Sequence, residues 1–159
     1  MSYKYRRLRL DELEELEKEF VDFLIINGVA ADDWTAIKEK EPKKAETIID
    51  LFSDVVFEGI LRKTKFLEFV ARNSIMTFQC LKDKLVLIGM DTSDSSIDLR
   101  DEATYKQLSE GKLLDQVKIY RQEKKYSADR NTEIFRMIEQ GCYITEGLWF
   151  KKLALLLPK

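Results

Sequence analysis

The sequence predicts an α+β protein in which helices pack on one face of a three- to four-stranded antiparallel sheet. The chain before residue 64 has apolar residues at the spacing of amphipathic helices. Residues 64–90 contain three short runs rich in β-branched, aromatic and aliphatic side chains, separated by polar pairs at 72–73 and 82–83. Because 159 residues suit one core, we expect a basic N-terminal arm over 1–10 and a single α+β domain over 11–159.

The most regular stretch is PKKAETIIDLFSDVVFEGIL, residues 42–61, which we expect to be the central helix. Its apolar residues recur so that they form one broad stripe. Pro42 suits the first helical position, because its missing N–H would have no partner there. A helix over about 11–27, ended by Asn27-Gly28, and a short helix before Pro42 are expected to precede it. We expect the apolar strand at 84–90 to pack against the central helix.

The second half of the chain continues with a polar loop at 91–98 and a helix at 99–110. Residues 117–122 alternate between polar and apolar side chains and are a candidate fourth strand. A helix at about 128–140 follows and ends at Gly141. The segment 148–157, LWFKKLALLL, is expected to be a core helix, since its large apolar side chains favour burial.

The composition restricts the chemistry that the chain can carry out. There is no histidine, which removes histidine-based catalytic triads and mixed Cys/His zinc sites. Cys80 and Cys142 stand alone in the sequence and are predicted to be free thiols. No glycine-rich phosphate loop is present. We therefore expect no cofactor, and the balance of the sequence favours a protein that is not an enzyme.

The charge and apolar patterning indicate a cytoplasmic protein. The net charge of −2 gives no bulk attraction to nucleic acid or to an anionic membrane. The basic start, KYRRLRL, leads into DELEELEKE and not into the apolar stretch of a signal peptide. The longest apolar runs are too short to span a bilayer, so no membrane partner is expected.

An acidic loop is the best candidate for a divalent-metal site, because hard cations prefer clustered carboxylate oxygens. The candidate ligands are Asp91, Asp94 and Asp98. Their spacing does not match an EF-hand, and no glycine provides its sharp turn. Asp98 could equally be the N-cap of the following helix, and this capping interpretation is favoured over a metal site.

Two groups of basic residues, both interleaved with tyrosines, are candidates for binding single-stranded nucleic acid. They are Lys4, Arg6, Arg7 and Arg9 in the arm, and Arg121, Lys124 and Lys125 further along. The slightly acidic total charge and the lack of a ribonucleoprotein motif argue against this use. A solvated basic surface is the favoured interpretation.

The central helix carries a row of carboxylates at a spacing of four residues: Glu46, Asp50, Asp54 and Glu58. Like charges at this spacing disfavour an isolated helix by about 0.2–0.5 kcal/mol per pair. A solvated face is slightly favoured. The alternative is that the row meets a basic surface, either the arm of this chain (Arg6, Arg7 and Arg9) folded back or an external partner. This alternative makes the four carboxylates the candidates for partner binding.

Four passages together resemble a small family of bacterial proteins of unknown function. They are YRRL at 5–8, ADDWTAIKEKEP at 31–42, LFSDVVFEGIL at 51–61 and FRMIEQGCYITEG at 135–147. The resemblance spans nearly the whole chain and implies a cytoplasmic bacterial domain. It brings no substrate, cofactor or active-site residue with it.

The leading hypothesis is a non-catalytic cytoplasmic interaction protein that binds another protein. One alternative is an RNA-associated or ribonucleoprotein-associated factor that uses the basic arm. A further alternative is a divalent-metal-dependent enzyme that uses the carboxylates of residues 91–102. The sequence does not predict an oligomeric state.

Overall fold

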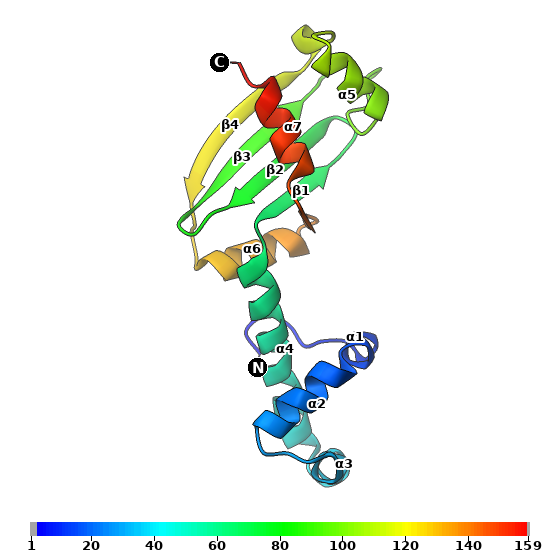
Figure 1. The fold of residues 1–159 in the computed structure, drawn as a ribbon, viewed down its shortest axis with the longest axis vertical. Coiled ribbons are helices and arrows are strands. Elements are labelled where there is room, and N and C mark those ends of the chain that lie inside the picture. The colour runs from blue at the N-terminus through cyan, green and yellow to red at the C-terminus, as the bar shows by residue number, and fades with distance from the viewer. Residues whose placement is uncertain (1–2, 159) are drawn as a thin grey trace. The chain divides into compact units, whose positions relative to one another are not determined.

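The computed structural model describes residues 3–158 and confirms the α+β class. Within these residues it has seven α-helices and one five-stranded antiparallel sheet, so the predicted strand number of three to four is too low. The chain divides into two compact units, residues 1–62 and 63–159 (Figure 1), which are described separately. That residues 11–159 fold as one domain stays a prediction.

The first unit consists of four helices: α1 (Leu10–Glu15), α2 (Glu17–Ile26), α3 (Ala31–Lys40) and α4 (Pro42–Lys63, whose last residue belongs to the second unit). The single helix predicted over 11–27 is two helices, because the backbone leaves helical geometry at Leu16. Its predicted end is confirmed. Gly28 has a φ of 78°, and the Val29 N–H donates to the Leu24 carbonyl at 2.8 Å, as in a Schellman cap.

Aromatic side chains from three helices form the core of the first unit. The ring of Phe52 on α4 lies 5.0 Å from that of Phe20 and 5.3 Å from that of Phe23, both on α2. Trp34 on α3 meets the Phe20 ring edge-on at 5.1 Å. Phe52 is fully buried. The apolar stripe predicted for the central helix thus fixes α4 against its neighbours.

The sheet belongs to the second unit, in the order β4-β3-β2-β1-β5. The strands are β1 (Phe66–Val70), β2 (Ser74–Cys80), β3 (Lys84–Asp91), β4 (Lys118–Lys125) and β5 (Tyr143–Thr145). The three-stranded meander and the fourth strand are as predicted. Strand β5 was not predicted, because three residues between two glycines are too few for an alternating pattern. It pairs with β1, so that Ile144 lies opposite Leu67.

Helix α7 (Leu148–Leu156) covers one face of the sheet at β2 and β3 (Figure 1). Its Leu153 is buried with Ile75, Ile88 and Met90 of these strands, which confirms the predicted core helix. Helix α5 (Glu102–Ser109) adds Leu108 to the same cluster. The predicted packing of strand 84–90 against α4 concerns both units and stays a prediction.

On the opposite face, the end of the Tyr120 side chain of β4 lies over Gly89, its cross-strand neighbour on β3. A Cβ atom at residue 89 would come within 2.4 Å of the tyrosine ring, so any other residue there would force the Tyr120 side chain to move. Helix α6 (Arg130–Glu139) is tied to the end of the sheet by the Arg130 guanidinium, which donates to the carbonyls of Thr64 and Cys80.

None of the helices in the described part of the chain combines the length and the apolar character needed to cross a bilayer.

Candidate interaction site on helix α4

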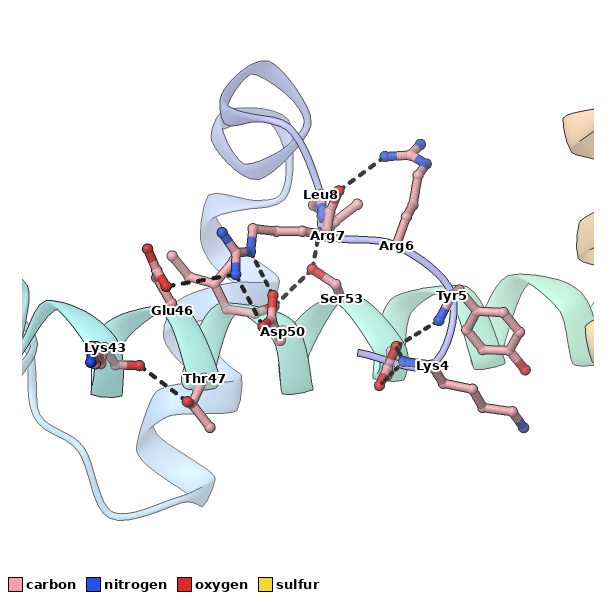
Figure 2. A network of polar contacts seen from close by, with 12 residues as sticks. Lys4, Tyr5, Arg6, Arg7, Leu8, Lys43, Glu46, Thr47, Asp50 and Ser53 are labelled. Atoms are coloured by element: carbon pink, nitrogen blue, oxygen red, sulfur yellow. Dashed lines mark hydrogen bonds and ion pairs between the residues drawn. The ribbon is translucent and has the colours of Figure 1, made fainter. Parts of the chain in front are cut away.

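Residues 5–8 of the arm run along α4 in the opposite direction, after a bend of the chain at Lys4 and Tyr5 (Figure 2). The Lys4 side chain reaches Glu58, and the Arg7 side chain reaches Asp50. These two carboxylates are eight residues apart, so the side chains of the arm cover about two turns of α4.

An ion pair with two hydrogen bonds joins Arg7 of the arm to Asp50 of α4. Arg7 Nε donates to Asp50 Oδ1 at 2.6 Å, and Nη2 donates to Oδ2 at 3.1 Å, which is the paired geometry that guanidinium and carboxylate groups favour. Asp50 is only 2% exposed, whereas the Arg7 side chain is 42% exposed. Glu46 lies 3.9 Å from the same guanidinium. The hydrogen bond that Arg7 donates to Asp50 raises the pKa of Arg7 above its ordinary value, so its charge is permanent.

Side chains of α4 also accept backbone N–H groups of the arm. The N–H of Lys4 donates to both Asp54 oxygens at 2.8 Å, and the N–H of Tyr5 donates to Oδ1 at 3.3 Å. The N–H of Leu8 donates to Ser53 Oγ at 2.9 Å, and that hydroxyl donates to the Ile49 carbonyl. These bonds depend on the path of the backbone and not on which side chains the arm carries.

Tyr5 contacts Glu58, at the opposite end of the acidic row from Glu46. Its hydroxyl donates to Glu58 at 2.8 Å, and Lys4 Nζ lies 3.4 Å from the same carboxylate. Burial of the ring, followed by the Glu58 hydrogen bond, raises the pKa of Tyr5 to about 12. Tyr5 and Leu8 are both buried, so the arm contributes apolar contacts as well as charge. The Tyr5 ring packs beside Phe57 of α4.

Arg6 and Arg9 both contact Glu12 and fix the arm to α1. Arg6 donates two hydrogen bonds to Glu12, at 2.7 and 2.8 Å, and its guanidinium lies over the Phe57 ring. The hydrogen bond from Arg6 lowers the pKa of Glu12 to about 2. Glu12 also accepts the N–H of Arg9, the residue before α1.

The structure thus brings the acidic row together with the arm, which was one of the two basic surfaces considered for it, and it is Arg7 that pairs with the row at Asp50, while Arg6 and Arg9 pair with Glu12. The acidic row is in contact with a basic surface, and that surface is the chain's own arm; a merely solvated face, the slightly favoured interpretation, does not describe it. Sequence reasoning missed Ser53, Tyr5 and Leu8, because the row was defined by charge alone. Binding of a partner by Glu46, Asp50, Asp54 and Glu58 stays a prediction, as does nucleic-acid binding by the arm. We call Glu46, Asp50, Ser53, Asp54 and Glu58 the α4 cradle.

The second basic group lies on β4, in the other unit. Arg121 donates to Glu123 at 2.7 Å, and Lys124 donates to the buried Glu133 of α6 at 2.9 Å. Lys125 is exposed at the end of the strand. Two of the three cations therefore have carboxylate partners within the unit, and their use in nucleic-acid binding stays a prediction.

The candidate metal ligands are each engaged locally. Asp91 accepts the Ser74 hydroxyl, Asp94 accepts Ser96, and Asp98 pairs with Arg100 at 2.8 Å. Over residues 3–158, no three His, Cys, Asp or Glu side chains are grouped as a metal site requires.

The N-cap of α5 is Asp101, whose Oδ1 accepts the Ala103 N–H at 3.0 Å. An aspartate therefore caps this helix, as expected, but the prediction that it is Asp98 is wrong.

Cys80 and Cys142 are not joined to each other. Burial raises the pKa of the Cys80 thiol to about 12, and burial also raises that of Cys142. At neutral pH both are thiols and poor nucleophiles.

The fold and this site define a two-unit α+β protein in which a helix with a carboxylate row holds the basic arm of the same chain. The chain belongs to a family of unknown function, DUF6495, whose model matches residues 1–158. The predicted membership of a family of unknown function is thereby confirmed, while a bacterial origin and a cytoplasmic location stay predictions. No curated protein and no solved structure matches the chain.

Proposed function

We propose that this protein is a non-catalytic protein-binding module in which the α4 cradle receives a basic segment of another protein. The observation that carries the proposal is the way in which the cradle holds the arm. It combines carboxylates that pair with cations and side-chain oxygens that accept backbone N–H groups. Peptide-recognition sites use the same combination, in which main-chain bonds contribute affinity and side-chain contacts contribute specificity.

Electrostatics supports a cationic occupant. Four carboxylates spaced four residues apart repel one another along α4, by about 0.2–0.5 kcal/mol for each exposed pair. A segment that brings cations to Asp50 and Glu58 removes this repulsion and adds charge-assisted hydrogen bonds. A surface with one sign of charge also speeds the encounter with an oppositely charged partner.

The two cysteines support a non-catalytic role and a cytoplasmic location. The raised pKa of Cys80 makes this thiol unsuited to nucleophilic catalysis. Two cysteines without a disulfide are typical of a reducing compartment, which supports a cytoplasmic location.

The experiment is site-specific photo-crosslinking in the native cell. A photoreactive amino acid replaces Glu46, whose side chain is 60% exposed and lies at one end of the cradle. We expect cross-links to another protein, at a segment rich in lysine and arginine, and we expect Asp54→Asn to abolish them. The matched control is Glu19→Gln, which removes an exposed carboxylate from α2 instead. Cross-links that persist in the Asp54→Asn chain, or that map to segments without cations, contradict the proposal.

A further inference from the structure

We infer that the α4 cradle selects segments of the pattern Lys-Tyr-x-Arg-Leu, and that the arm competes with the partner for it. This inference rests on the proposed function and adds to it the chemistry of the partner and the means of regulation. Its basis is the set of contacts that the arm makes, which serve as a template for the bound segment.

Each position of the pattern corresponds to one contact of the arm. Arginine is required opposite Asp50, because only a guanidinium donates two parallel hydrogen bonds to a buried carboxylate. Tyrosine is required opposite Glu58, where a ring is buried and its hydroxyl donates. An apolar residue follows the arginine, since Leu8 is only 5% exposed.

The position of Arg6 is open in the pattern. Its guanidinium donates to Glu12 of α1, which is not part of the cradle, and lies over the Phe57 ring. The lysine position of the pattern corresponds to Lys4. Its backbone N–H donates to Asp54, and its side-chain cation lies near Glu58. The cradle thus distinguishes a spaced pattern from a merely basic sequence.

Competition follows from the covalent attachment of the arm. A segment tethered next to its site has an effective concentration on the order of millimolar. A partner that binds the same groups must displace it, so its apparent affinity falls by the fraction of molecules in which the cradle is open. Any change that weakens the arm without altering the cradle should therefore strengthen binding of a segment added in trans.

The test uses the full-length chain and a fluorescent peptide with the sequence of the arm, YKYRRLRL. Arg7→Gln weakens the arm and leaves every residue of the cradle in place, and Arg7→Glu does so more strongly. All chains carry Trp149→Phe, so that the fluorescence of Trp34, which packs on Phe20, shows that the first unit is folded in each variant. Binding is measured by fluorescence anisotropy.

We expect the peptide to bind the Arg7→Gln chain about tenfold or more tightly than the wild-type chain. Asp50→Asn in the same chain should lower the affinity about tenfold, and a scrambled peptide of equal composition should bind as weakly. Equal affinity for the wild-type and Arg7→Gln chains overturns the competition. Equal affinity for the arm peptide and the scrambled peptide overturns the pattern.

These outcomes are separate from those of the cross-linking experiment. Cross-links to a basic segment together with unchanged peptide affinity would leave the proposed function standing and reject this inference. Peptide binding that follows the pattern, without any cross-linked partner, would support the cradle and reject the proposed cellular role. A third outcome is that the wild-type chain forms a dimer and that the peptide dissociates it. The cradle would then bind the arm of a second copy of this chain, and the proposal of a different protein as the partner would be wrong.

Discussion

Removing the Arg7 guanidinium should destabilise the first unit measurably, because it leaves a buried carboxylate without its cation. The perturbation is Arg7→Met, which keeps the apolar part of the side chain and removes its charge. Asp50→Asn and the double variant complete a double-mutant cycle, which isolates the coupling free energy between the two side chains.

The structure places the expected magnitude between two limits. Exposed ion pairs contribute about 0.2–1 kcal/mol, whereas removing one partner of a fully buried pair costs about 3–5 kcal/mol. Asp50 is 2% exposed, but the Arg7 side chain is 42% exposed, so solvent screens the pair and water reaches Asp50 once Arg7 is shortened. We therefore expect Arg7→Met to lower the free energy of unfolding by about 1–2 kcal/mol, with a coupling free energy of about 1 kcal/mol.

The chain offers a direct assay, because it has two tryptophans and each unit contains one. In a Trp149→Phe background, the fluorescence of Trp34 reports on the first unit alone. Unfolding by urea avoids the ionic screening that guanidinium chloride would add. A coupling free energy near zero at low salt would show that this ion pair does not hold the arm on α4, and would refute the reasoning.

Three further changes test other parts of the structure. Gly89→Ala should destabilise the second unit by about 1–3 kcal/mol, because the new Cβ meets the Tyr120 ring, and Tyr120→Ser in the same chain should restore part of the loss. Arg130→Met should lower the free energy of unfolding of the second unit by about 1–3 kcal/mol, since backbone carbonyls lose this donor. Thermal unfolding of the second unit measures the effects of Gly89→Ala and of Arg130→Met, and an unchanged melting temperature would contradict the corresponding prediction. The pKa of Glu12 is held at about 2 by its hydrogen bonds from Arg6, below an ordinary value near 4.5, so this carboxylate contributes stability above pH 4.5 that is lost as the pH falls towards 2. Glu12→Gln should flatten the decrease in stability over this window, and an unchanged slope would show that this pair does not control it.

The elements with strong sequence patterns were predictable. The stripe on α4 and the Asn27-Gly28 stop define helix positions by local chemistry, and the three runs over 64–90 define a meander by local turns. The break at Leu16 was not predictable, because the apolar pattern continues across it. Strand β5 exists because β1 provides a pairing edge, which is a long-range effect.

The candidate site was predictable only in part. A charge row at a spacing of four and a basic arm are visible in the sequence, and the arm was one of two counter-surfaces considered. The pairing of Arg7 with Asp50 links residues 43 positions apart, which no local pattern encodes. Ser53 carries no charge and accepts a backbone N–H, so nothing in its sequence context distinguishes it from an ordinary helical serine.

The most direct test of the account is nuclear magnetic resonance of the labelled wild-type chain, titrated with the unlabelled arm peptide. We predict that resonances of Asp50, Ser53 and Asp54 shift, and that the amide protons of Lys4 and Leu8 exchange faster with solvent as the peptide takes their acceptors. Shifts confined to the second unit, or slow exchange of both amides at saturating peptide, would contradict the claim that the α4 cradle receives a basic segment in trans.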